Sequence, residues 1–236
     1  GKGKGRTMNG TVVLVTGANG GLGSFVTTAF LEAGASVIGV SRSIQQSDFA
    51  GEGFVAMPAE IASRESAAML VERVMERFGK LDVVAHLIGA FAGGKPVTGT
   101  GDQTLELMLG VNFRSLFHLA RVAIPPMREK GYGRLIAIGS RAALEASPNA
   151  AAYAASKAAL ITLVRCLAAE NEDTGITANV VVPGTIDTPA NRRADPAADF
   201  SRWVDPRQIA NLVVWLASDQ ASQVNGAAIP VFGRGL

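Results

Sequence analysis

The stretch from Thr11 to Gly34 constrains the fold most, because a buried strand, a glycine-rich turn and a helix follow one another directly. The run Thr11–Val15 is apolar and β-branched without alternation, as in a strand covered on both faces of a parallel sheet. A helix is predicted from Ser24 to Ala33. Glycines at such a junction let the backbone approach a pyrophosphate, whose charge is met by the positive end of the helix. The stretch therefore predicts a dinucleotide-binding unit.

The same alternation of strand and helix continues along the chain without a repeat or a break in composition. Further strands are predicted at residues 36–40, 54–57, 81–88 and 133–138, and helices after a cap at Ser63, at about 103–128 and at 151–160. This order predicts an α/β fold, a doubly wound parallel sheet (Rossmann fold) of about seven strands flanked by helices. With 236 residues, 48% of them apolar, we expect one domain over residues 9–236. Residues 1–8 are expected to be a disordered or added tail.

Composition narrows the class of protein. The formal charge is +2, and three basic residues lie in the first six, so no basic stripe for nucleic acid is expected. The apolar runs are too short to span a bilayer, which takes about 20 residues. A single cysteine and two distant histidines predict neither a disulfide nor a metal site. We expect a cytoplasmic protein in which Cys166 packs into a helix face.

Tyr153 and Lys157 are the first candidates for chemistry. The segment 151–160 lacks glycine and proline and consists mostly of small helix formers, so residues four apart should share one helix face. A tyrosine titrates near pH 10, and an ammonium one turn away stabilises its phenolate. The pair therefore predicts a tuned proton donor, and two unrelated residues on a solvated helix are the alternative.

The end of the second strand predicts the choice of cofactor. An acid at that position holds the ribose 2'-hydroxyl of NAD, whereas an arginine accepts the 2'-phosphate of NADP. The sequence has Ser41, Arg42 and Ser43 there, so NADPH is expected to be preferred, with NAD possible. Glu60 and Ile61 follow the third strand, where an adenine would rest. A surface role for Arg42 is the alternative.

Three further features complete the pattern. Asn112 is a polar residue among apolar ones in the predicted long helix, either on a solvated turn or buried with partners. The glycine-rich loop 92–96 should lie over the nicotinamide end. The turn glycine Gly17 and the residues Gly89, Ser140 and Pro183 all follow predicted strands, where ligands of such sheets bind.

Together these residues resemble the short-chain dehydrogenase/reductase family over Asn9 to Gly233. The motifs that match are the turn Thr16 to Gly23, Asn112, Ser140 thirteen residues before Tyr153, Lys157, and Val182-Pro183-Gly184 with Thr188. The resemblance implies Tyr153 as catalytic acid/base, Lys157 as the group that lowers its pKa and holds the nicotinamide ribose, Ser140 as the orienter of the carbonyl, and Asn112 as the holder of a relay water. The implied cofactor contacts are Thr16, Gly17, Asn19, Gly21, Leu22, Gly23, Ser41, Arg42, Ser43, Glu60, Ile61, Gly89, Tyr153, Lys157, Pro183, Gly184, Ile186 and Thr188.

The chain departs from the family pattern at three places. His86 stands where the family has a structural asparagine, Glu60 replaces the usual aspartate, and Phe232-Gly233-Arg234 replaces Asp-Gly-Gly. A lone histidine on an apolar strand is more often a core residue with satisfied hydrogen bonds than a catalyst.

Two loops refine the likeness within the family. Residues 89–94 and 186–203 are similar to dihydropteridine reductases, and they supply the substrate candidates Phe91, Asn191, Phe200 and Trp203. The segment 185–203 is expected to be a mobile flap, poorly ordered without ligand. We expect a carbonyl reductase or alcohol dehydrogenase acting on a small molecule, as a homotetramer or homodimer. A dihydropteridine reductase, a 3-oxoacyl thioester reductase and a catalytically silent nucleotide-binding sensor or scaffold are the alternatives. The acidic segment 170–173 argues against docking an acidic carrier protein.

Overall fold

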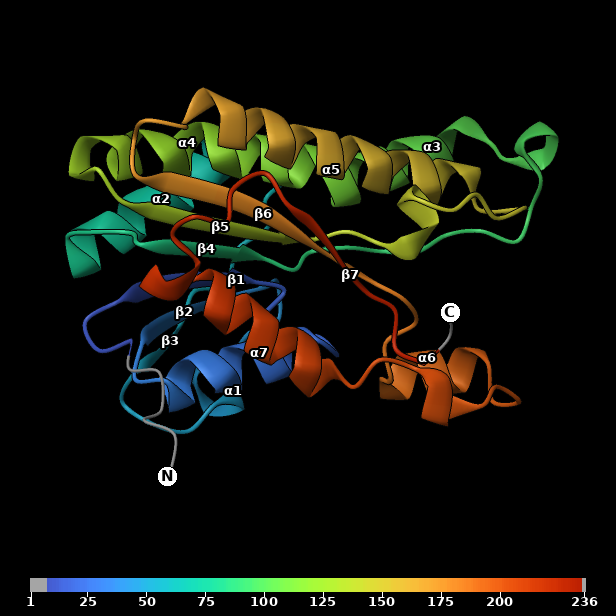
Figure 1. The fold of residues 1–236 in the computed structure, drawn as a ribbon, viewed down its shortest axis with the longest axis horizontal. Coiled ribbons are helices and arrows are strands. Elements are labelled where there is room, and N and C mark those ends of the chain that lie inside the picture. Colours follow the sequence, from blue (N-terminus) through green and yellow to red (C-terminus); the bar gives the residue numbers. More distant parts are fainter. Residues whose placement is uncertain (1–7, 235–236) are drawn as a thin grey trace.

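A computed structural model describes residues 8–234 and has a seven-stranded parallel sheet at its centre (Figure 1). The strands are β1 Val12–Thr16, β2 Ser36–Val40, β3 Phe54–Ala56, β4 Val83–His86, β5 Gly133–Ile138, β6 Ile176–Pro183 and β7 Ala228–Val231. Their order in the sheet is β3-β2-β1-β4-β5-β6-β7. The order in which the chain adds strands to the sheet therefore reverses between β1 and β4, which places a crevice at the carboxyl ends of these two strands. The predicted fold class is confirmed.

Helices cover both faces of the sheet. They are α1 Gly23–Glu32, α2 Arg64–Phe78, α3 Asp102–Leu109, α4 Ser115–Lys130, α5 Ala151–Glu170, α6 Pro189–Ala194 and α7 Pro206–Leu216. Two hydrophobic cores result, one under α1 and α7 and one under α2, α4 and α5 (Figure 1). Because β1, β4, β5 and β6 are fully buried between the layers, their sequences are mostly apolar, with His86, Arg134, Thr177 and Asn179 among the buried polar exceptions.

The segment 102–130 differs from the single helix that the sequence predicts. A π-helical turn, Gly110–Arg114, separates α3 from α4, and the N–H of Ser115 donates to the carbonyl of Gly110, five residues back. Asn112 lies inside this turn and is fully buried. Such a turn shifts the helix register, so side chains before and after it face different neighbours.

Two predictions, one on the start of the domain and one on the packing of Cys166, need correction. Met8, which the sequence analysis placed in the tail, is buried, and its N–H donates to the carbonyl of Ala33 at 2.6 Å. The rest of the predicted tail, residues 1–7, lies outside the described residues. Cys166 is exposed on α5, so it does not pack as expected.

Two helical stretches, Asp102–Lys130 and Ala151–Glu170, are long and apolar enough to cross a membrane by length and composition alone. This is weak evidence, because helices that cover a protein core pass the same test. Both stretches place one face on the larger hydrophobic core.

Candidate active site

The glycine-rich turn after β1 leaves backbone exposed where a nucleotide would bind. Gly17 has a φ of +69°, and a Cβ there would lie 3.2 Å from the backbone carbonyl of Leu87. A Cβ at Gly23 would lie 1.8 Å from the carbonyl oxygen of Gly17, so no larger residue fits. Gly20 and Gly21 are exposed at the entrance to α1. The turn thus lacks side chains that would block a pyrophosphate, and it ends at the helix N-terminus that binds one.

Near the end of β2 lie Arg42, which is predicted to select the cofactor, and an acid that was not predicted, Asp48. The side chain of Arg42 is 80% exposed, and its Nη1 lies 4.0 Å from Oε1 of Glu60. Asn19 donates to Oγ of Ser43 at 3.4 Å and to Oδ2 of Asp48 at 3.3 Å. Asp48 belongs to a short 3-10 helix six residues beyond Arg42, so no pattern in the sequence placed it beside this site.

Ser140 and Tyr153 meet at the carboxyl end of β5. Ser140 follows this strand and caps a short 3-10 helix, with Oγ accepting from the N–H of Ala142 at 3.2 Å. Tyr153 lies in the first turn of α5, and its side chain lines the same cavity as the Ser140 side chain, which acts on the pKa of the phenol. The ring of Phe91 stands edge-on to the Tyr153 ring, with centroids 5.0 Å apart. The two hydroxyls are therefore placed to contact one substrate oxygen.

Lys157 and Asn112 both lie close to Gly89. The ammonium of Lys157 donates to the carbonyl of Ile138 at 2.9 Å. Oδ1 of Asn112 accepts from the N–H of Ala90 at 2.9 Å, and Nδ2 donates to the Ala90 carbonyl and to Oγ of Ser156, both at 3.0 Å. A Cβ at Gly89 would lie 3.1 Å from Nζ of Lys157 and 3.3 Å from Oδ1 of Asn112. Of the two alternatives for Asn112, the buried residue with partners is correct.

The pKa values of Tyr153 and Lys157 are set mainly by burial. Desolvation of the phenolate raises the pKa of Tyr153 above 10.0, and the hydrogen bond from Ser140 offsets only part of this effect. Burial lowers the pKa of Lys157 to about 8. The charge of Lys157 is not among the causes that shift the pKa of Tyr153 here, so the lowering of that pKa by Lys157 stays a prediction. The ammonium of Lys157 is directed to the Ile138 carbonyl in this structure.

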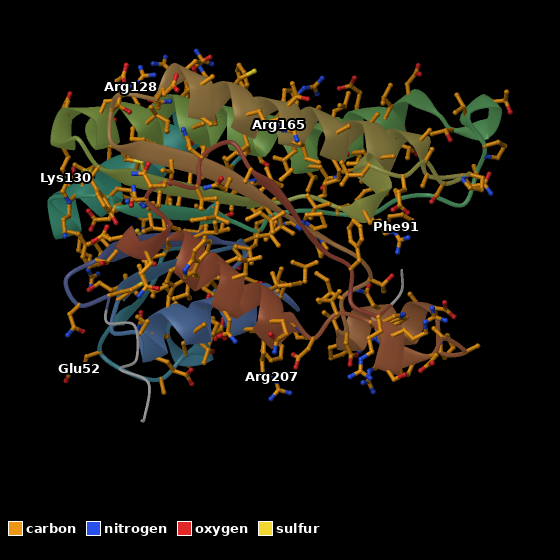
Figure 2. All side chains as sticks on the ribbon, in the orientation of Figure 1. Glu52, Phe91, Arg128, Lys130, Arg165 and Arg207 are labelled. Atoms are coloured by element: carbon orange, nitrogen blue, oxygen red, sulfur yellow. The ribbon has the colours of Figure 1, made fainter. Side chains whose placement is uncertain are left out.

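A cavity of about 1040 Å³ opens in front of these hydroxyls. Figure 2 shows Phe91 at this end of the sheet and Lys130 at the other. Of the predicted residues, Ser140, Tyr153, Lys157, Pro183, Gly184, Ile186, Phe91, Asn191 and Trp203 line it. Phe200 does not line it but packs on Trp203, with ring centroids 4.8 Å apart.

The segment 185–203 forms one wall of the cavity and has more local structure than predicted. It contains α6 and a 3-10 helix, Phe200–Arg202, and a bridge pairs Ile186 with Val204. The buried Thr188 caps α6 and lies against the glycine turn, because a Cβ at Gly21 would meet its Cγ2 at 3.1 Å. The mobility of the segment stays a prediction.

Several cavity residues escaped the sequence analysis. They are Arg141, Glu145, Ser147, Asp195, Asp199, Arg202 and Phe232. The guanidinium of Arg141 stacks over the ring of Phe232 at 4.9 Å, and its Nε donates to Glu145 at 2.6 Å. Arg141 directly follows Ser140, and this position was the one available signal. Within residues 8–234, no group of three His, Cys, Asp or Glu residues could hold a metal ion.

The fold and the site together define a class of protein, a dinucleotide-binding oxidoreductase. A glycine turn follows the first strand of a parallel sheet, and a serine, a tyrosine and a lysine line one cavity beside the sheet. A family model described as Enoyl-(Acyl carrier protein) reductase matches residues 17–233. The chain belongs to the short-chain dehydrogenase/reductase family and is an oxidoreductase of that family.

Individual relatives agree along nearly the whole chain. The 3-oxoacyl-(acyl-carrier-protein) reductase of Escherichia coli (strain K12) is 31% identical over 238 residues, covering 96% of this chain and 97% of that protein. The 2-dehydro-3-deoxy-D-gluconate 5-dehydrogenase of Pseudoalteromonas atlantica (strain T6c) is 30% identical over 245 residues, with 96% of each covered. Levodione reductase superposes with a TM-score of 0.85 at 25% identity, covering 96% of this chain and 97% of the other.

Proposed function

We propose that this protein is an NADPH-preferring carbonyl reductase or alcohol dehydrogenase in which Tyr153 is the acid/base. The observation that carries the proposal is that Ser140, Tyr153 and Lys157 line one cavity together, with the ammonium of Lys157 held by the carbonyl of Ile138. A carbonyl that gains a hydride develops negative charge on its oxygen and needs donors in place and one proton. This edge of the sheet offers both.

Each residue has a distinct role in the proposed reaction. The bound nicotinamide cofactor supplies or accepts the hydride. Ser140 orients the carbonyl oxygen, and the phenol of Tyr153 delivers the proton to it. Lys157 holds the ribose, and its positive charge stabilises the phenolate that remains after the proton has been transferred. The carboxamide oxygen and nitrogen of Asn112 are both bonded, to Ala90 and to Ser156, so Asn112 fixes the loop and α5 relative to each other. A relay water would therefore have to bind an atom of Asn112 outside this carboxamide.

The cofactor would lie along the turn Thr16 to Gly23, with its adenosine end at Ser41, Arg42 and Ser43. The exposed guanidinium of Arg42 supports a preference for NADPH, because it can bind a 2'-phosphate. Asp48 works in the opposite direction, since its carboxylate lies next to Asn19 and repels a phosphate. The proposal is that Arg42 outweighs Asp48.

A 3-oxoacyl thioester is the second candidate substrate, because relatives of 27% to 31% identity are named 3-oxoacyl-(acyl-carrier-protein) reductases. The acidic segment 170–173 does not argue against it. Glu170 ends α5, and Tyr153 lies near its start, so about 25 Å of helix separate the two. At this distance the negative charges of the segment have little electrostatic effect on a substrate in the cavity.

One assay separates the candidates. Oxidation of NADPH and NADH should be followed with simple aldehydes, ketones and quinones, with a 3-oxoacyl thioester and with quinonoid dihydropterin. Turnover of carbonyls by the natural chain, and its loss in Tyr153→Phe, would support the proposal. Nucleotide binding without turnover of any substrate would instead support a silent sensor or scaffold. Assembly as a homodimer or homotetramer stays a prediction.

A further inference from the structure

His86 lies at the centre of a buried chain of hydrogen bonds that joins three elements. It ends β4 and is 1% exposed. Its Nδ1 lies 3.0 Å from Oγ1 of Thr16 at the end of β1, and its Nε2 lies 3.1 Å from Oγ of Ser115 at the start of α4. The neighbouring groups complete the chain, because the N–H of Leu87 donates to Oγ1 of Thr16 at 3.1 Å and Oγ of Ser115 donates to the carbonyl of Val111 at 2.7 Å.

The partners fix which nitrogen of His86 carries the proton. Ser115 uses its single hydroxyl proton for the Val111 carbonyl, so its oxygen must accept from His86, and Nε2 is the protonated nitrogen. Nδ1 is then an acceptor, and the hydroxyl of Thr16 donates to it. Every donor in the chain therefore points one way, from Leu87 through Thr16, His86 and Ser115 to Val111.

The last bond of this chain stabilises the π-helical turn. In an α-helix the N–H of Ser115 would donate to the carbonyl of Val111, but here it donates to Gly110. The Ser115 hydroxyl donates to the Val111 carbonyl, which this shift leaves without the N–H of Ser115. The turn in question presents Asn112 to Ala90 and Ser156, directly behind Lys157 and Tyr153.

We infer that His86 is a positioning residue that holds the nucleotide-binding turn at Thr16 in register with the π-helical turn that carries Asn112. This inference rests on the proposed function. It goes beyond the expectation that His86 is only a satisfied core residue, because its two nitrogens bind the two parts of the site that must meet. His86 is buried and does not line the cavity, so it is not placed to contact a substrate there.

The tautomer is the first test and needs no activity. The chain has two histidines, so a protein labelled with ¹⁵N-histidine gives two sets of ring signals, and His118→Gln assigns them. We expect a single Nε2-protonated tautomer for His86 at neutral pH. A protonated Nδ1, or an average of two tautomers, would overturn the directed chain and with it the inference.

Two conservative variants then separate the two ends of the ring. Gln places an amide N–H near the position of Nε2, and Asn places a carbonyl near that of Nδ1. His86→Gln should keep the bond to Ser115 and lose the bond to Thr16, whereas His86→Asn should keep the bond to Thr16 and lose the bond to Ser115. Either loss breaks the link between the two turns, so each variant should lower kcat about five- to tenfold, the scale of one hydrogen bond. In His86→Asn the KM for the nucleotide should change little, because Thr16 keeps its acceptor.

Ser115→Ala tests the same hydrogen bond from the side of Ser115. It should lower kcat as much as His86→Asn does, and the double variant should be no worse than either single one, because all remove the same link. Additive losses, or variants that lose only thermal stability while each folded molecule keeps its full kcat, would show that His86 is structural. If the natural chain reduces no carbonyl, the proposed function fails, and the tautomer together with non-additive stability losses still reports on the chain of bonds.

Discussion

At Tyr153 the polar contact that matters is the one with Ser140, because burial works against the charged form of the phenol. Tyr153→Phe keeps the ring against Phe91 and removes only the acid. We expect kcat to fall at least ~100-fold, the usual scale of general acid catalysis, with nucleotide affinity within about twofold of normal. Steady-state kinetics and a nucleotide titration would check this. Near-normal turnover would remove Tyr153 from the mechanism.

The choice of cofactor is a second residue-scale prediction. Replacing Ser41 by Asp together with Arg42→Ile should turn a preference for NADPH into one for NADH, because the 2'-phosphate then meets a carboxylate and no cation. Asp48→Asn should act in the opposite sense and tighten NADPH binding about threefold, since a nearby like charge is removed. Dissociation constants for both nucleotides would decide, and Arg64→Ile on the exposed start of α2 is a control for loss of an arginine. Tighter binding of NADH by the natural chain would show that Arg42 is a surface residue.

The residues that the sequence could predict are those tied to a local pattern. Tyr153 and Lys157 share a helix face, and Gly17 and Gly23 belong to one turn, so their spacing places them together. Asp48 reaches Asn19 across 29 positions, and no local pattern encodes that contact. Phe200 is a similar case, since composition predicted an aromatic at the cavity but not which of two stacked rings faces it.

At the scale of elements, the cavity wall 185–203 should set substrate preference. Trp203 faces the cavity, whereas Thr188 connects the wall to the nucleotide turn. Trp203→Ala should change the relative kcat/KM of bulky and small carbonyls about tenfold or more, through lost contact area with the substrate, and should leave NADPH affinity nearly unchanged. Arg193→Ala, exposed on α6 and outside the cavity, is the matched control. An unaltered ranking across the panel would make this wall purely structural.

The π-helical turn shows why one element could not be predicted. Helical periodicity runs through residues 102–130, and the sequence therefore predicts one helix. The register shift at Gly110–Arg114 coincides with bonds from Asn112 and Ser115 to β4, its following loop and α5. These are long-range contacts, and they favour a backbone that local propensity alone does not.

The whole molecule has two polar poles at opposite ends of the sheet. One is the site at the carboxyl ends of the strands, and the other centres on Asp82 at the start of β4. The side chain of Asp82 is 4% exposed, accepts from the N–H of Val12 at 2.8 Å and from Lys80 at 2.9 Å, and is paired with Lys130. Although burial alone would raise the pKa of Asp82, these hydrogen bonds outweigh it and lower the pKa from 3.8. Asp82→Asn should therefore destabilise the fold at neutral pH by about 2 kcal/mol, measured by urea unfolding.

The contributions of the two poles to the free energy of unfolding should be lost at different pH values as the protein is acidified. Burial, and to a lesser extent the charge of Lys157, depress the pKa of His86 from 6.5 to about 3, so between these values the unfolded chain binds a proton that the folded chain does not. Stability is then complete above pH 6.5 and falls by up to about 1.4 kcal/mol per pH unit as pH drops towards 3. Asp82 follows the same sign in a lower window, because its contribution is complete above 3.8 and is lost as pH falls through its lowered pKa.

Matched variants can separate the two contributions. Unfolding free energies from urea titrations between pH 7 and pH 4 should fall less steeply in His86→Gln than in the natural chain, with a difference on the order of 2–3 kcal/mol over this range. Asp82→Asn should be less stable at every pH in that range and keep the slope, since its carboxylate titrates below it. His118→Gln removes the other histidine and is the control for loss of an imidazole. If His86→Gln and the natural chain lose stability in parallel, then His86 takes up its proton in the folded state, and the directed chain from Thr16 to Val111 cannot be the arrangement that holds the site together.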